Sequence, residues 1–461
     1  MHAYRTHAVC AASAFFALFV AVVLFTAAAS PLSAQADVAA MVAGTAPAPA
    51  SVTFRVIYNN QGYNQPSRLI EGSPGVFYSI AGSGPSVAFS VTTQGSRTIL
   101  ANFPGGVFQS LLVSAPNGRF YSSIYSGTTS VFSVTSAPNS LRTYSARTFD
   151  PLLIQSLPDG TLLSVGTGGA DGLWHLIRCD LHGNVTSIAT VPSGERLENA
   201  MFASDGNYYG IAQALLGSNS YVFRATASGT LTTIYTFPAG TFTSGFRATP
   251  LLEADDGNFY GSTATGGANG TGMIYKLTPA GQFTLLHSFE KGKYPSGPTT
   301  LIEASDGNLY GDALAPDLAG QIFRITKSGQ YTLLHQMTGP GAGGCPCWLV
   351  QGSDGIVYGM AHTGGTSGDG LVFALDPGLP IPKPRAQSFS PQSGAASTKV
   401  RIWGHNLLSA AVQFNGVPAA AVSNSGPNYV WAKVPAGATT GPITVTTPGG
   451  TDTTQASFAV Q

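Results

Sequence analysis

One short phrase recurs through most of the chain and constrains its fold more than any other feature. It reads LLEADDGNFYG over residues 251–261 and LIEASDGNLYG over residues 301–311. When the turn glycine is taken as the anchor, seven copies appear, at intervals of 43, 42, 46, 51, 50 and 48 residues. The anchors are Gly75, Gly118, Gly160, Gly206, Gly257, Gly307 and Gly355. Strand-rich repeats of roughly 40 to 50 residues are typical of propeller blades.

Each repeat contains four strand-like pieces. In the sixth repeat these are TTLIEA, NLYGDALA, GQIFRITKSG and QYTLLHQM, between residues 299 and 337. Asp306 and Gly307 join the first two, because Asp-Gly supplies the positive φ that a tight hairpin needs. A tyrosine stands three residues after every anchor except the third, where Leu163 replaces it. Such recurring large side chains predict layers packed between neighbouring sheets.

The two ends of the repeat region predict how the sheets close. The seventh repeat stops at LVFALDPG (371–378) without a fourth strand, whereas SVTFRVIY (51–58) resembles a fourth strand and precedes the first anchor. If this segment joins the last sheet, a ring closes and two exposed sheet edges disappear. We therefore predict an all-β fold with a seven-bladed β-propeller over residues 51–378, closed by an N-terminal strand. An open β-solenoid is the alternative.

The repeat also resembles a known family. LIEASDGNLYG, GGANGTGMIYKLTPAG and FTLLHSF are similar to the GloVer tandem repeat of exported bacterial proteins. The resemblance is strong over residues 246–376 and weaker over residues 51–245. It implies a secreted or surface-attached protein without an established activity. Members of the family often end in an anchoring or sorting segment, and this chain departs from them by ending in QASFAVQ.

A second module follows the repeats. The Pro-rich stretch LPIPKPR (379–385) predicts a short, stiff linker. Within residues 386–461, strand-like KVRIWG, AVQFNG, YVWAKV and GPITVTT are separated by turn residues, which predicts a small immunoglobulin-like β-sandwich. The elements SPQSG, WGHNL, FNGVP and VPAG are similar to IPT/TIG domains. That resemblance implies an accessory module for adhesion, spacing or sugar binding, and it brings no catalytic residue.

The N-terminus predicts export. A positive start, an apolar run from about Val9 to Ala29 and the A-Q-A site at residues 34–36 predict a signal peptide over residues 1–36. Residues 37–50 are then a linker. An uncleaved anchor is the alternative, because the apolar run is nearly long enough to span a bilayer. We expect a secreted or cell-surface protein with no membrane span after cleavage.

The charge and the cysteine content of the chain argue against two kinds of function. Charged residues make up 9% of the chain, with 21 basic and 21 acidic, so no basic stripe is present to bind nucleic acid. Removal of the signal peptide leaves Cys179, Cys345 and Cys347. An odd number leaves one thiol unpaired, and the last two cysteines are too close for an unstrained disulfide. We expect no functional role for them.

No catalytic residue, metal or cofactor is predicted. His287 and His335 occupy equal places in two T-L-L-H segments, which indicates inheritance by repetition rather than a shared metal site. The Asp-Gly turns offer one or two carboxylates each, fewer than a calcium site needs. The chain has neither a G-x-S-x-G nor an H-E-x-x-H motif.

One set of residues is a candidate binding site. Four residues before their anchors stand Glu71, Glu253, Glu303 and Gln351, in blades that become neighbours once the ring closes. At the mouth of an axial pocket they would bind a cation or sugar hydroxyls, or act as an acid/base pair. The alternative is that each one accepts hydrogen bonds from nearby backbone N–H groups.

Two functional hypotheses follow. The favoured one is an exported, non-enzymatic binding or scaffold protein whose partner is an extracellular polysaccharide or a surface protein. Its ligand would meet a propeller face that carries Gly-rich loops such as residues 266–270 and 364–370. The alternative is a carbohydrate-active hydrolase or lyase that uses Glu253 and Glu303. For glycoside hydrolysis those two carboxyl groups would have to lie roughly 5 to 10 Å apart.

Overall fold

The computed structural model of the chain is an all-β protein. It describes residues 52–60, 67–82, 86–103, 107–108, 111–125, 129–145, 149–168, 171–214, 219–238, 250–290, 296–314, 320–338, 343–424 and 426–461. Within these ranges there are 38 strands and no helix, which confirms the all-β prediction. A membrane-crossing helix is accordingly not found among them. The predicted signal peptide and linker, residues 1–50, lie outside the described residues.

Residues 53–376 form seven antiparallel sheets, one for each anchor glycine. The first contains β2 (Ile70–Ser73), β3 (Val76–Ala81), β4 (Ser86–Thr92) and β5 (Arg97–Phe103). The second contains β6 (Val107–Phe108), β7 (Val113–Ser114), β8 (Phe120–Tyr125), β9 (Thr129–Val134) and β10 (Arg142–Ser145). The third contains β11 (Phe149–Ser156), β12 (Leu162–Gly168), β13 (Trp174–Cys179) and β14 (Val185–Thr190).

The remaining four sheets repeat this order. The fourth contains β15 (Glu195–Phe202), β16 (Tyr208–Ala214), β17 (Tyr221–Ala225) and β18 (Leu231–Thr236). The fifth contains β19 (Leu252–Glu253), β20 (Phe259–Thr263), β21 (Met273–Leu277) and β22 (Phe283–Ser288). The sixth contains β23 (Ser296–Glu303), β24 (Leu309–Leu314), β25 (Gly320–Ile325) and β26 (Tyr331–Gln336). The seventh contains β27 (Gly344–Gln351), β28 (Val357–Thr363), β29 (Leu371–Asp376) and β1 (Thr53–Asn59).

The N-terminal strand therefore completes the last sheet. β1 runs antiparallel to β29, with Phe54 opposite Leu375 and Val56 opposite Phe373. It takes the outer position that the fourth strand occupies in the other sheets. The Phe54 ring also stacks on His335 of the sixth sheet at 4.0 Å between ring centroids. Two ends of the chain's repeat region thus share one sheet.

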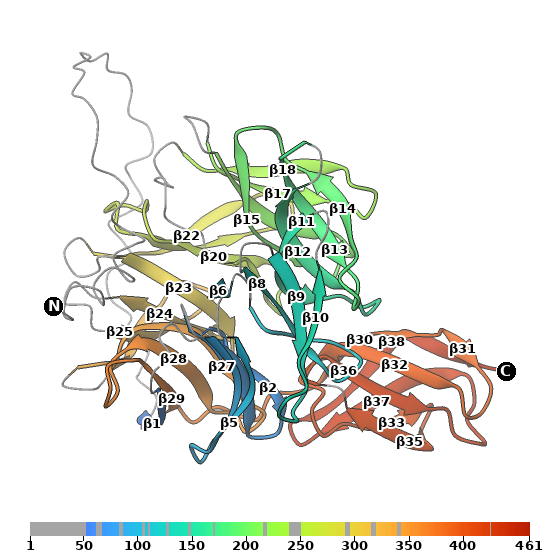
Figure 1. Cartoon of the computed structure of the whole chain (residues 1–461). Coiled ribbons are helices and arrows are strands. Elements are labelled where there is room, and N and C mark those ends of the chain that lie inside the picture. Colours follow the sequence, from blue (N-terminus) through green and yellow to red (C-terminus); the bar gives the residue numbers. More distant parts are fainter. Residues whose placement is uncertain are drawn as a thin grey trace, which may run out of the picture.

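The hydrophobic core is divided among clusters that each join two neighbouring sheets. Tyr78 of the first sheet stacks on Phe120 of the second, with 4.3 Å between centroids. The same kind of contact, Phe77 against Tyr358 at 4.3 Å, joins the first sheet to the seventh. In Figure 1 the blue strands of the first sheet lie beside the orange strands of the seventh. The sheets consequently pack in sequence, and the last packs on the first.

The Tyr-Gly pair that ends the last four copies of the phrase has a packing reason. A Cβ added to Gly261 would lie 2.4 Å from the Tyr275 hydroxyl oxygen, and one added to Gly311 would lie 2.4 Å from the Phe323 ring. Each glycine therefore lets an aromatic ring of the third strand cross the second strand. Gly359 stands against Phe373 in the same way, at 2.3 Å.

Two further sheets form the C-terminal module, residues 385–460. One contains β30 (Arg385–Ser390), β32 (Lys399–His405), β36 (Tyr429–Lys433) and β35 (Ala421–Asn424). The other contains β31 (Ser393–Gly394), β38 (Gly450–Val460), β37 (Gly441–Thr447), β33 (Ala411–Phe414) and β34 (Val417–Pro418). A single hydrophobic cluster takes side chains from both sheets, including Ile402 and Val445. The module lies to one side of the seven sheets, in orange and red in Figure 1.

Candidate functional site

The anchor turns are held by an aspartate and a tyrosine. In four sheets the turn aspartate accepts a hydrogen bond from the tyrosine four residues later. The distances are 2.7 Å for Tyr209–Asp205, 2.8 Å for Tyr260–Asp256, 3.0 Å for Tyr310–Asp306 and 2.6 Å for Tyr358–Asp354. Burial and the neighbouring carboxylate raise the pKa of each of these tyrosines. The aspartates are thus structural parts of the turns.

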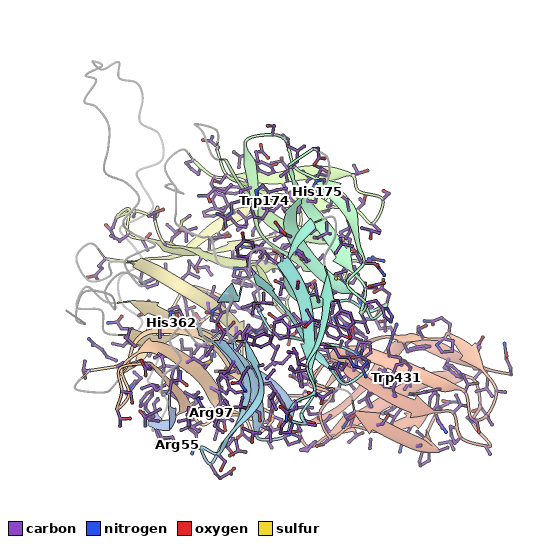
Figure 2. All side chains as sticks on the ribbon, in the orientation of Figure 1. Arg55, Arg97, Trp174, His175, His362 and Trp431 are labelled. Carbon is purple, nitrogen blue, oxygen red and sulfur yellow. The ribbon has the colours of Figure 1, made fainter. Side chains whose placement is uncertain are left out.

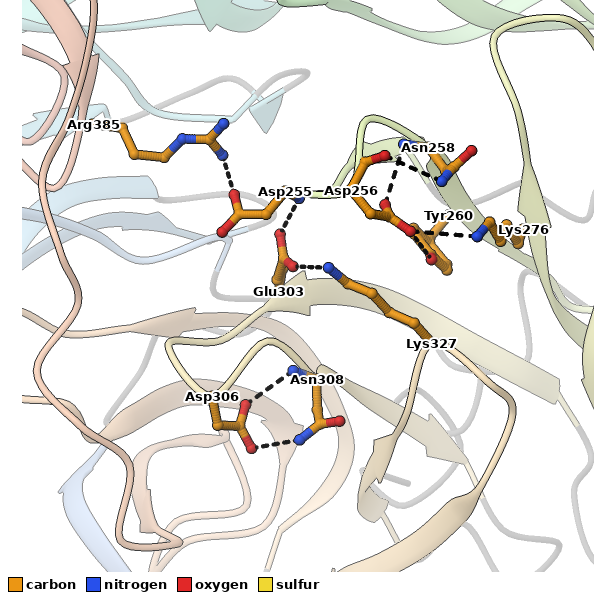
Figure 3. A network of polar contacts seen from close by, with 10 residues as sticks. All are labelled: Asp255, Asp256, Asn258, Tyr260, Lys276, Glu303, Asp306, Asn308, Lys327 and Arg385. Atoms are coloured by element: carbon orange, nitrogen blue, oxygen red, sulfur yellow. Dashed lines mark hydrogen bonds and ion pairs between the residues drawn. The ribbon is translucent and has the colours of Figure 1, made fainter. Parts of the chain in front are cut away.

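Asp256 shows how strongly such a turn holds its carboxylate. Burial alone would raise the pKa of Asp256, but hydrogen bonds from Asn258, Tyr260 and Lys276 lower it to about 2. The Lys276 ammonium lies 3.3 Å from this carboxylate, as Figure 3 shows. Among the described residues, no group of three or more His, Cys, Asp or Glu side chains has the arrangement of a metal site.

Glu71 joins the first sheet to the seventh. Its Oε1 accepts hydrogen bonds from the Gly75 N–H at 2.8 Å and from the Ser353 hydroxyl at 2.8 Å. Its Oε2 accepts one from the Ser353 N–H at 2.7 Å. The residue is 6% exposed, and burial raises the pKa of its carboxyl although these hydrogen bonds partly offset the effect. Glu71 is therefore a buried connection between two sheets.

Glu253 and Glu303 make the same connection in the next sheets. Glu253 of the fifth sheet accepts hydrogen bonds from the N–H of Ser204, at 2.9 Å, and from the Ser204 hydroxyl in the fourth sheet. Glu303 of the sixth sheet accepts one from the Asp255 N–H at 2.8 Å and pairs with Lys327 at 2.5 Å. Figure 3 shows Glu303 between these two partners.

Gln351, the fourth member of the set, carries an uncharged amide in place of a carboxylate. Its Oε1 accepts a hydrogen bond from the Ser305 N–H of the sixth sheet at 2.9 Å. Its Nε2 donates to the Ser305 hydroxyl at 2.7 Å and to the Gly355 carbonyl at 3.0 Å. All four candidate residues thus bind a serine or aspartate N–H in the turn of the preceding sheet. We call this contact the turn clasp.

The turn clasp corresponds to the alternative reading of these residues as hydrogen-bond acceptors, except that the donors lie in a neighbouring sheet. Among the interactions of the described residues, no hydrogen bond or ion pair joins one of these four side chains to another. Each carboxylate has two or more polar partners, which hold Glu253 and Glu303 to turns of the preceding sheets.

The other three sheets carry a different residue at this position, and there the C-terminal module binds. The Ser114 hydroxyl lies 3.4 Å from the Asn428 amide oxygen. Ser156 forms a side-chain hydrogen bond with Tyr429, and the Phe202 ring lies 6.4 Å from the Trp403 ring. A sequence comparison of this one position among repeats separates the two groups, but nothing in the sequence says that the module covers the second group.

Side chains of the module donate hydrogen bonds to backbone carbonyls of the turns. The Trp431 indole N–H donates to the Pro116 carbonyl at 2.8 Å, and Arg401 donates to the Pro158 carbonyl at 2.9 Å. The buried Tyr429 hydroxyl donates to the Leu157 carbonyl. Figure 2 shows Trp431 where the module meets the seven sheets. Lys399 and Arg401 lie over its ring, with 4.3 and 5.7 Å to the centroid.

An ion pair extends this interface to the fifth sheet. Arg385, the first residue of β30, pairs with Asp255 of the turn whose N–H is bound by Glu303 (Figure 3). His405 lies beside that pair, where burial and the positive charge of Arg385 lower the pKa of its imidazole to about 4. The module and the segment before it thus cover the end of the sheets where the predicted polar arc lies.

The histidines of the T-L-L-H segments stand apart from each other. His287 stacks on Tyr331 at 4.4 Å and His335 stacks on Phe54 at 4.0 Å, each across two outer strands. Burial lowers the pKa of both imidazoles. Each histidine is therefore an aromatic packing residue between sheets. Cys179 is a free, buried thiol.

Comparison with known proteins supports the repeat and the fold type. Residues 196–406 match the model of the Gloeobacter/Verrucomicrobia repeat. No curated protein sequence matches the chain. A streptogramin B lyase structure is 13% identical, with a TM-score of 0.52, over 72% of this chain and 99% of that chain.

Two other solved structures score lower. PorZ, a surface component of the type-IX secretion system of Porphyromonas gingivalis, is 13% identical, over 88% of this chain and 61% of that chain, with a TM-score of 0.47. A copper-bound fungal alcohol oxidase of the AA5 family is 11% identical, over 86% and 99%, with a TM-score of 0.44. Identities this low bear on fold alone. This chain has propeller-like sheets, and residues 196–406 carry the Gloeobacter/Verrucomicrobia repeat.

Proposed function

We propose that the seven sheets form one closed seven-bladed β-propeller, with the C-terminal module as an immunoglobulin-like sandwich of the IPT/TIG type. The pairing of β1 with β29 and the packing of Phe77 on Tyr358 support closure, because both join the beginning of the repeat region to its end. Two sheets around one hydrophobic cluster support the sandwich.

We further propose that the protein is an exported, non-enzymatic binding or scaffold protein of the bacterial exterior, with an extracellular polysaccharide or a surface protein as its partner. One observation carries the proposal: the module is fixed to the turn end of the sheets through backbone carbonyls, so the two parts make one rigid platform. Partners then meet the opposite end, where the loops between second and third strands lie.

The alternative, a carbohydrate-active hydrolase or lyase working through Glu253 and Glu303, has less support. Both carboxylates hold turns of the preceding sheet, and Glu303 is also paired with a lysine. An acid/base pair needs at least one carboxyl group that is free to exchange a proton with substrate.

A binding screen separates these functions. The full mature chain is tested on an array of bacterial glycans and on cell-wall fragments, and the same polysaccharides are checked for shortening. We expect binding without turnover. Polysaccharide turnover that Glu253→Gln and Glu303→Gln abolish, with the fold intact by circular dichroism, would refute the binding-only proposal in favour of the enzyme.

A further inference from the structure

Arg68, which precedes β2 of the first sheet, is a cation without a partner among the residues that the structure describes. The N–H of Ser67 donates to the Ile80 carbonyl at 2.8 Å, so the residues before β2 continue the inner strand. Leu69 is fully buried in the cluster between the first and seventh sheets, and the adjacent Arg68 is exposed. No described residue forms a hydrogen bond, ion pair or ring contact with Arg68.

The surroundings of Arg68 differ from those of an ordinary surface arginine. Its side chain reaches solvent, yet desolvation by the protein around it lowers the pKa of the guanidinium. The two observations together indicate a side chain that has protein around it and is still open to solvent. A partly desolvated charge without a counter-charge is unfavourable in the unbound protein, and an anionic ligand relieves that cost.

Trp348 stands at the same position of the neighbouring sheet. Arg68 lies three residues before Glu71, and Trp348 lies three residues before Gln351, the equivalent turn-clasp residue. The first and seventh sheets share a hydrophobic cluster, and packed sheets lie roughly 10 Å apart. The two side chains therefore occupy neighbouring inner strands at equal distance from the turns.

The backbone of Trp348 is strained. Its φ is 59°, at the irregularity of β27 between Cys347 and Val350, and its N–H donates to the Thr300 hydroxyl at 2.9 Å. Positive φ is unfavourable for a bulky side chain, and such strain is concentrated at functional sites. The following residue, Leu349, is buried in the core, whereas half-buried Trp348 belongs to none of the hydrophobic clusters of the described residues. Core packing of the indole therefore does not offset the cost of the positive φ at Trp348.

We propose that Arg68 and Trp348 form a binding site for an acidic sugar unit, such as a uronate of an anionic polysaccharide. The guanidinium fork matches a carboxylate in bidentate geometry, and the flat indole packs against the apolar face of the sugar ring. This inference deepens the proposed binding function and rests on the closed ring.

Calorimetric titration of the full mature chain tests the charge requirement. The probes are an oligogalacturonate and the same oligomer with its carboxylates methyl-esterified, both in 0.15 M salt. We expect the acid to bind at least tenfold more tightly than the ester. Arg68→Gln should weaken binding of the acid at least tenfold, whereas Arg142→Gln, at an exposed outer-strand arginine, should leave it unchanged. Equal affinity for acid and ester, or equal loss in both variants, would overturn the site.

Trp348→Gly tests the indole with a second readout. Glycine accepts a φ of 59° without strain, so the melting temperature should stay the same or rise while binding falls at least tenfold. A clear drop in melting temperature would show that the indole is a packing residue and would overturn its assignment. Binding of neutral glycans alone would leave the proposed binding function intact and refute this site, whereas no binding to any glycan or cell-wall fragment would count against both.

Discussion

The seven repeats use one position in two different ways. In the first, fifth, sixth and seventh sheets, Glu or Gln four residues before the anchor glycine forms a turn clasp to the preceding sheet. In the second, third and fourth sheets, the same position holds Ser114, Ser156 and Phe202, and the C-terminal module contacts it. The clasped sheets stabilise their turns with their own side chains, whereas the module-bearing sheets leave turn carbonyls for another domain to bind. A repeat array can thus build a docking surface by omitting one interaction.

Removal of β1 should have the largest effect, because it takes the outer strand from one of the clasped sheets. Deletion of residues 51–59 removes the outer strand of the seventh sheet and the partner of the His335 ring. We expect a loss of roughly 3 kcal/mol of unfolding free energy from the half-buried Phe54, Ile57 and Tyr58 side chains of this strand. Denaturant unfolding followed by tryptophan fluorescence measures the change. A peptide of residues 51–60 should restore part of it, and an unchanged midpoint would argue against closure.

Conversion of a module-bearing sheet to the clasped type should release the module. Ser114 is 1% exposed beneath Asn428, so the longer carboxylate of Ser114→Glu has no room while the module is docked. We expect separation of the two parts and an effect of roughly 2 kcal/mol, typical of overpacking at a buried position. Protease cleavage in residues 379–384 reports undocking. Ser228→Glu, at an exposed turn, is the matched control and should leave the cleavage rate unchanged.

Loss of one turn clasp should cost less. Glu71→Gln keeps the size of the side chain but replaces one acceptor oxygen by an N–H₂ group. In place of Oε2 this group faces the Ser353 N–H, and in place of Oε1 it faces the Gly75 N–H and the Ser353 hydroxyl. We expect a fall of about 1–2 kcal/mol in the free energy of unfolding. Urea denaturation measures this fall, with Gln413→Glu at an exposed position of the module as the reverse control. Wild-type stability in Glu71→Gln would show that the clasp contributes nothing.

At neutral pH the smallest effect should come from His405 at the module interface, because its protonation changes stability only at lower pH. Burial and Arg385 lower the pKa of His405 to about 4, while Asp255 opposes them. The ordinary value is about 6.5. Between these values the unfolded chain binds the proton more readily, so this residue makes stability fall as the pH decreases from about 6.5 to about 4. His405→Gln should flatten that part of the melting-temperature profile relative to wild type. Parallel profiles would contradict the assignment.

Local patterns predicted much of the fold. The Asp-Gly turns and alternating runs indicated the strands, and β25 begins at Gly320 as the sequence of the sixth repeat predicts. The predicted polar arc is a different case. Glu71, Glu253, Glu303 and Gln351 do lie at equivalent places, but their hydrogen-bond donors come from the adjacent repeat some 50 residues earlier or, for Glu71, from Ser353. Repeat spacing carries no information on which neighbour's backbone points at a side chain.

The amino-acid sequence by itself determined the repeated four-stranded unit, since turn chemistry and strand periodicity act between residues that are close along the chain. It also placed the glycine that follows the tyrosine in the last four copies of the phrase, which meets an aromatic ring of the same repeat. Only the tertiary structure decided the positive φ of Trp348 and the coverage of the turns by Trp431 and Arg401. Those relations join residues up to 315 positions apart, and their geometry depends on how whole sheets and modules pack.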